Sequence, residues 1–118
     1  MNLLIIFCGG GIGALLRYSI IISLPYDQNI NIYLVNLIGC FLMGIIFAYF
    51  SNKGQIYVLL SIGIVGSFTT MSAFTNNSLE LMLATKYFQA FTYSLIMLVI
   101  CLSANIIGYA FIKNLFYD

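Results

Sequence analysis

Four long runs of apolar residues follow one another along the chain, and short polar segments separate them. The runs cover about residues 3–24, 32–50, 56–84 and 87–112. A membrane-spanning helix needs roughly 20 apolar residues, so each run is long enough to cross a bilayer. The pattern predicts an all-α integral membrane protein with four transmembrane helices, forming one domain over residues 1–118. Tyrosines near the ends of the runs, Tyr33 among them, fit an interfacial aromatic belt.

Composition agrees with this pattern and excludes several other classes of protein. Of the 118 residues, 63% are hydrophobic and only 6% are charged, whereas a soluble domain is about 25% charged. A net charge of +1 offers no basic surface, so we expect no nucleic-acid partner. The chain has no His and no coherent set of acids, bases and nucleophiles, so we expect no enzyme.

The three cysteines, Cys8, Cys40 and Cys101, all fall inside apolar runs. Their separations match no metal-ligand spacing. We therefore expect them to act as small hydrophobic residues.

The positive residues are divided almost evenly between the two predicted sides of the membrane. Lys53 and Lys113 fall on the side of the N-terminus, and Lys86 falls on the other side, with Arg17 towards the end of the first run. The positive-inside rule therefore has little bias to act on. Such a chain can insert both ways, and two opposed copies can pair about a two-fold axis in the membrane plane. The alternative is that one or two charges, or a partner protein, decide the orientation.

Polar and small residues inside the first two runs leave more than one interpretation open. Gly9 and Gly13 have the GxxxG spacing that is typical of close helix packing. Arg17 either extends to the membrane interface or places a positive charge at the mouth of an anion pathway. The amide of Asn36 either offers N–H donors to an anion or bridges two helices.

The fourth run carries Ser94, Cys101 and Asn105 close to one helical face. Residues four and seven apart lie on the same side of a helix. This face is either a polar track or a seam between helices.

The third run contains the strongest local signal, the segment Gly66-Ser67-Phe68-Thr69-Thr70-Met71-Ser72. Hydroxyl residues and glycine favour local hydrogen bonds over a continuous helix, so we predict a helix broken in the middle of the membrane. A break leaves carbonyls from Gly66 to Thr69 without helical partners, and lipid cannot satisfy them. Carbonyls from two copies can then converge on one small cation. The alternative is an unbroken helix whose hydroxyls bond back to preceding carbonyls.

Taken in order, the stretches 9–18, 35–41 and 66–74 resemble the Fluc (CrcB) family of fluoride channels, and Gly108 also fits. Size, the number of spans and the order of the motifs all agree with that family, so the resemblance extends over essentially the whole chain. It implies a dual-topology antiparallel dimer with two pores in the cell (plasma) membrane. Its expected partners are fluoride, the lipid bilayer and a second copy of the chain. The dimer passively exports cytoplasmic F⁻ and so reduces fluoride toxicity.

The resemblance also implies roles for individual residues. Backbone carbonyls of Gly66 and Thr69 hold a structural Na⁺ that is not transported, and Arg17 lies in the pore vestibule. The fluoride path is formed by Asn36, Thr70, Met71, Ser72, Phe74 and Tyr93. Neutral donors of this kind can replace the water around a small, strongly hydrated anion without binding it too tightly for release.

Three departures from the family pattern bear on the assembly. Met71 replaces the first pore Phe, Asn77 stands where an acidic residue is expected, and Met97 replaces a Ser. Two assemblies therefore stay open, a functional homodimer and a heteromeric pair in which this chain contributes a partly degenerate pore. A small multidrug exporter is disfavoured because it needs an embedded carboxylate, and Glu80 is the only acidic residue within a run.

Overall fold

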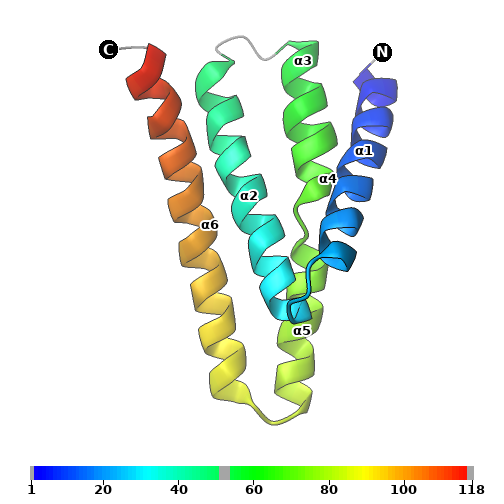
Figure 1. The fold of residues 1–118 in the computed structure, drawn as a ribbon, viewed down its shortest axis with the longest axis vertical. Coiled ribbons are helices and arrows are strands. Elements are labelled where there is room, and N and C mark those ends of the chain that lie inside the picture. Colours follow the sequence, from blue (N-terminus) through cyan, green and yellow to red (C-terminus); the bar gives the residue numbers. More distant parts are fainter. Residues whose placement is uncertain (1, 51–53, 117–118) are drawn as a thin grey trace.

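The computed structural model describes residues 2–50 and 54–116, and all regular secondary structure in these ranges is helical (Figure 1). Three long helices are continuous: α1 (Asn2–Ser23), α2 (Gln28–Tyr49) and α6 (Tyr87–Phe116). The third apolar run forms a series of elements, namely α3 (Gln55–Tyr57), the π-helix η1 (Val58–Val65), α4 (Gly66–Phe68) and α5 (Met71–Leu83). Four helical stretches are long and apolar enough to span a membrane. The all-α prediction with four spans is therefore confirmed.

Two helix boundaries differ from the predicted runs. Helix α2 begins at Gln28 rather than near Ile32, and α6 continues to Phe116 rather than ending near Ile112. The early start of α2 includes Asn31, whose Nδ2 donates to carbonyls at the end of α1 and in the following turn. Polar residues that hold a turn thus extend a helix beyond its apolar stretch, which hydropathy does not detect.

The two termini lie at one end of the molecule, and the turn between α5 and α6 lies at the other (Figure 1). Lys86 is in that turn and Lys113 is in the last turn of α6. These two residues therefore occupy opposite ends, as the alternation of spans predicts, while Lys53 lies outside the described residues. The α5–α6 hairpin extends beyond the α1–α2 turn, so its outer part has fewer neighbours within the chain (Figure 1).

Glycines bring the helix backbones into close contact at three places. A Cβ atom at Gly13 would overlap the carbonyl oxygen of Ile64, and one at Gly9 would lie 3.0 Å from the Cα of Gly63. Between α2 and α6, a Cβ at Gly44 would overlap the backbone of Asn105. Close packing is therefore confirmed for Gly9 and Gly13 of the first run.

Gly108 extends the contact between α2 and α6. A Cβ atom there would overlap the carbonyl oxygen of Phe41. We call this contact, made by Gly44, Asn105 and Gly108, the glycine seam.

Two residues with extended dihedral angles separate α4 from α5. Thr69 has φ −70° and ψ 155°, and Thr70 has φ −141° and ψ 103°. The side chain of Thr70 then accepts a hydrogen bond from the backbone N–H of Ala73 at 3.2 Å, which caps α5. We call Thr69–Thr70 the junction, because it joins the two parts of the third run.

Candidate functional site

The side chain of Asn36 binds the backbone of the junction on both sides. Its Oδ1 accepts from the N–H of Thr70 at 2.8 Å, and its Nδ2 donates to the carbonyl of Thr70 at 3.2 Å. Both residues are buried. In a continuous helix the N–H of Thr70 would bond to the carbonyl of Gly66. Asn36 therefore bridges α2 to the third run and takes the place of the missing helical hydrogen bond.

The Asn36 amide makes one further contact, which is weaker. Its Nδ2 lies 3.7 Å from Sδ of Met97 on α6. A thioether sulfur is a poor hydrogen-bond acceptor compared with an oxygen. One of the two N–H donors of Asn36 is thus held firmly by the Thr70 carbonyl, while the other has only a weak partner.

Arg17 also reaches the junction. Its Nη1 donates to the carbonyl of Thr69 at 3.3 Å, and the side chain is partly buried. The guanidinium of α1 therefore contacts the third run at the point where the helical hydrogen bonds stop. A fixed positive charge lies beside the junction as a result.

The two carbonyls proposed from the resemblance as Na⁺ ligands have different surroundings. The carbonyl of Gly66 does not receive a helical hydrogen bond from the N–H of Thr70, because that N–H donates to Asn36. It accepts instead from the hydroxyl of Thr69 at 3.4 Å. The carbonyl of Thr69 accepts from the cationic Arg17. Backbone carbonyls are hard oxygen ligands of the type that such cations prefer. Two carbonyls are too few to surround a cation, so these two carbonyls alone do not form a complete site.

A groove of about 300 Å³ lies beside the junction, between α2, α5 and α6. It is lined by Asn36, Cys40, Thr69, Met71, Phe74, Ser94, Met97, Leu98 and Cys101. It brings together three of the residues assigned to the fluoride path, Asn36, Met71 and Phe74. Met71 is 70% exposed at its edge, whereas Phe74 is 9% exposed.

The other residues of the predicted path lie around this groove rather than on its surface. The hydroxyl of Thr70 lies 3.4 Å from that of Ser72, which is exposed on the first turn of α5. Tyr93 packs behind the groove, where its ring stacks on Phe74 with centroids 5.3 Å apart. The residues that the resemblance assigns to the fluoride path therefore lie in one region of the fold.

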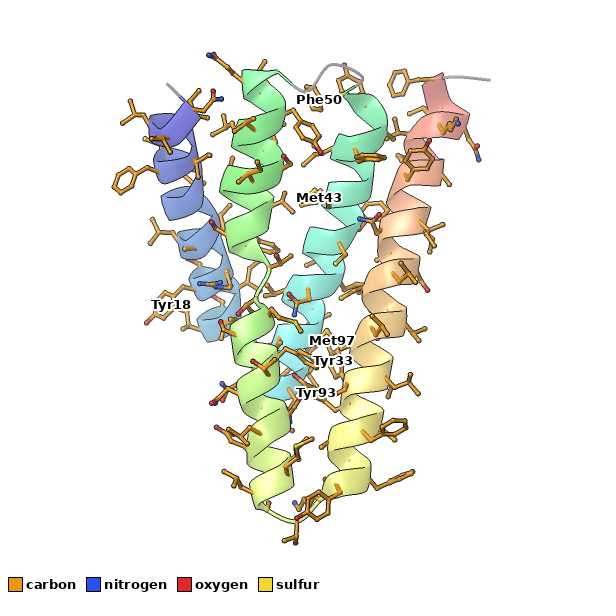
Figure 2. All side chains as sticks on the ribbon, turned by 180° about the vertical axis from the view of Figure 1, so that it is seen from behind. Tyr18, Tyr33, Met43, Phe50, Tyr93 and Met97 are labelled. Atoms are coloured by element: carbon orange, nitrogen blue, oxygen red, sulfur yellow. The ribbon has the colours of Figure 1, made fainter. Side chains whose placement is uncertain are left out.

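Tyr33 belongs to the same region, although the sequence placed it in an interfacial belt. Its hydroxyl donates to the carbonyl of Tyr93 at 2.8 Å, and its ring meets the ring of Tyr93 edge to face at 4.8 Å. Figure 2 shows Tyr33, Tyr93 and Met97 close together among α2, α5 and α6. The inward direction of Tyr33 is new information, because position near the end of an apolar run does not fix which way a side chain points.

Two buried polar atoms beside the aromatic rings have unused hydrogen-bonding capacity. The hydroxyl of Tyr93 and Oδ1 of Asn77 have no hydrogen-bond partner of good geometry among the described residues, although the side chains of Tyr93 and Asn77 lie close enough to interact. Asn77 is held by its other amide atom, which donates to Asn29 at 2.8 Å. A buried hydroxyl without a partner is costly unless a bound water or ion satisfies it.

The polar face of α6 acts as a seam between helices along much of its length. Nδ2 of Asn105 donates to the carbonyl of Cys40 on α2 at 3.2 Å. Ser94 donates to Ala90 within α6 and lies 3.5 Å from Ser78 of α5. The stretch of α6 from Ser94 to Cys101 also lines the groove, through Ser94, Met97, Leu98 and Cys101.

Comparison with known proteins finds one matching family and many relatives. The profile of the family described as "CrcB-like protein, Camphor Resistance (CrcB)" matches residues 4–109. A protein of Phocaeicola vulgatus named fluoride-specific ion channel FluC is 39% identical over 78% of this chain and 82% of its own length. Proteins of the same name from Campylobacter jejuni and Shewanella loihica are 34% and 36% identical. They match 95% and 91% of this chain and 98% and 92% of their own lengths.

Proposed function

The chain belongs to the CrcB family, and from that premise we propose that it is a fluoride-specific ion channel. The relatives are named as channels, so the expectation that the chain is not an enzyme is confirmed. The observation that carries the proposal is the groove beside the junction. There Asn36 presents an N–H whose only close partner among the described residues is the thioether of Met97.

The chemistry of the groove suits a small, strongly hydrated anion. Fluoride is a stronger hydrogen-bond acceptor than a thioether. It would therefore displace Met97 from the weakly bonded N–H of Asn36. The hydroxyl of Tyr93 lies beside Asn77 behind the groove, without a hydrogen bond of good geometry, and is a second neutral donor. The edges of the Phe74 and Tyr93 rings carry partial positive charge. Several weak neutral sites allow an anion to bind and leave quickly.

We place the channel in the plasma membrane as a passive exit for cytoplasmic fluoride. Neutral HF crosses membranes and dissociates inside the cell, where the anion is trapped. A passive pathway lets that anion leave and so reduces fluoride toxicity. Arg17, beside the junction, supplies a positive charge near the path without lining the groove itself.

The exposed face of α5 supports pairing with a second copy in the opposite orientation. Ser72, Asn76 and Glu80 recur every four residues, which places them on one face, and all are exposed. Asn76 donates to Glu80 at 2.9 Å, which satisfies only part of this polar surface. Lipid offers no hydrogen bonds to such a face at bilayer depth. We therefore propose that a second chain covers it, and that the junction lies in the middle of the membrane.

The same pairing completes a site for a structural Na⁺. Two opposed copies supply four carbonyls, those of Gly66 and Thr69 from each chain. Because Arg17 already donates to Thr69, the ion binds next to a fixed positive charge and gains most from the Gly66 carbonyl. The proposed role of Na⁺ is to hold two chains together, and it is not transported.

A heteromeric channel is the second candidate, and Met97 favours it. Met97 is 5% exposed and its sulfur lies against the Asn36 amide. A smaller polar residue at this position would leave that donor open to an anion. In the heteromer, a related subunit supplies an intact pore and this chain supplies a partly degenerate one.

The experiment that tests the proposal is fluoride release from liposomes that contain the purified chain alone. Vesicles are loaded with potassium fluoride, a potassium ionophore removes the membrane potential, and an electrode records the fluoride released. The homomeric channel predicts release well above that of empty vesicles. It also predicts slower release when a bulky organic cation replaces Na⁺ throughout purification. Release only after co-expression with a related chain would support the heteromer instead.

A further inference from the structure

Three sulfur atoms from two helices meet in the groove. Met97 and Cys101 are four residues apart on α6 and therefore share one face. The thiol of Cys101 donates to Sδ of Met97 at 3.7 Å. Cys40 on α2 lies near enough to Cys101 to interact with it electrostatically, and all three residues line the groove. No ligand spacing in the sequence joins them, because the third sulfur comes from another helix.

The separation of the two sulfurs on α6 matches coordination by sulfur. A metal with sulfur bonds of about 2.3 Å in a trigonal arrangement separates its ligands by about 4 Å. The observed distance between the sulfurs of Met97 and Cys101 is 3.7 Å. All three cysteines of the chain are free thiols, so Cys40 and Cys101 are both available as ligands.

The donor set selects a particular class of cation. Thiolate and thioether sulfurs are soft ligands that prefer Cu⁺ and similar ions, whereas hard cations prefer carboxylate and carbonyl oxygens. The chain has no His to offer. The groove lining contains no carboxylate. Sulfur donors with no His or carboxylate beside them therefore favour a soft cation over a hard one.

We propose that Cys40, Met97 and Cys101 form a binding site for a soft monovalent d¹⁰ cation such as Cu⁺ or Ag⁺. On binding, one cysteine thiol releases its proton to water and its thiolate bonds to the metal. One thiolate balances one monovalent charge, so the occupied site is neutral in its apolar surroundings. The groove is open at the edge formed by Met71, which is 70% exposed and leaves a route for the ion. This site is independent of whether the chain conducts fluoride.

The test is titration of the purified chain with Ag⁺ in chloride-free nitrate buffer. A Cys8→Ala background removes the exposed thiol outside the cluster. Calorimetry and the ultraviolet sulfur-to-silver charge-transfer band report binding. We expect one Ag⁺ per chain, with affinity at least tenfold lower in Cys40→Ala and in Cys101→Ala and severalfold lower in Met97→Leu. Met43→Leu is the matched control, because Met43 lies farther along α2, towards Phe50 (Figure 2).

Two results would overturn the site. One is Ag⁺ binding of unchanged affinity and stoichiometry in the variant that lacks all three cysteines. The other comes from X-ray absorption at the silver edge, measured on the Cys8→Ala protein with its cluster intact. Coordination by oxygen or nitrogen alone would exclude the sulfur site even if a cluster variant failed to fold.

Discussion

Helices α2 and α6 meet in two different ways along their lengths. At the glycine seam, the backbones of Gly44 and Gly108 approach the partner helix so closely that a Cβ has no room. Around Asn36 and Met97 the same two helices leave a groove of about 300 Å³ with a weakly satisfied N–H and three sulfurs. The seam fixes the two helices together, which allows the neighbouring region to hold polar groups without close packing. The contrast separates residues that maintain the fold from residues that shape the proposed path.

The largest expected effect comes from filling the glycine seam. Gly44→Ala and Gly108→Ala each place a Cβ against a backbone carbonyl that cannot move without shifting a helix. We expect each to lower the free energy of unfolding by about 3 kcal/mol, at the upper end of overpacking effects. Thermal unfolding in detergent measures this. Gly11→Ala is the control, because its Cβ would meet open space within the chain; equal melting temperatures for all three would refute the close approach.

The next effect compares the same substitution in the two regions. Asn36→Leu leaves the buried N–H and carbonyl of Thr70 without their partner, whereas Asn105→Leu frees only the carbonyl of Cys40. Leaving a buried donor or acceptor without a hydrogen-bond partner costs about 1–3 kcal/mol. We therefore expect Asn36→Leu to be destabilising by about twice as much as Asn105→Leu. Hydrogen exchange at the Thr70 amide should accelerate in the first variant alone, and exchange unchanged in both would show that Asn36 does not hold the junction.

A smaller effect tests the inward orientation of Tyr33. Tyr33→Phe removes the hydroxyl that donates to the Tyr93 carbonyl and keeps the ring contact. We expect a loss of about 1 kcal/mol, the usual net value of one hydrogen bond. Tyr18→Phe is the matched control, since Tyr18 is 63% exposed on α1 (Figure 2). Equal melting temperatures for the two variants would show that the hydrogen bond from the Tyr33 hydroxyl to the Tyr93 carbonyl does not stabilise the fold.

The four spans could be predicted because a helical stretch depends on neighbouring residues. Apolar runs give the four helical stretches, and Gly66 to Ser72 concentrates residues that compete with helical hydrogen bonds. The grouping of Asn36, Met71 and Phe74 came from the resemblance to a family rather than from spacing. Their common position on the groove is a consequence of the fold.

Contacts between distant parts of the chain could not be predicted in the same way. Asn36 binds Thr70, which lies 34 residues away, and no local pattern selects that partner from the other polar groups of the third run. From the sequence we expected Cys40 and Cys101 to act as separate small hydrophobic residues. The four-residue spacing of Met97 and Cys101 indicates that two sulfurs share one face of a helix, but it does not indicate that Cys40 lies nearby. The contact of Tyr33 with Tyr93 was not predicted, because hydropathy describes depth in the membrane and not direction around a helix.

The central claim is that the Asn36 side of the junction forms part of a fluoride path, and one flux measurement tests it most directly. Fluoride release is compared between liposomes that contain equal amounts of the unmodified chain, Asn36→Asp or Asn114→Asp. Asn36→Asp keeps the side-chain shape but replaces Nδ2, which donates to the Thr70 carbonyl and faces Met97, with a carboxylate oxygen. Asn114 is exposed near the end of α6. We predict rapid release from the unmodified chain and from Asn114→Asp, and release at least tenfold slower from Asn36→Asp. Equal release from all three, or none above empty vesicles, would contradict the account.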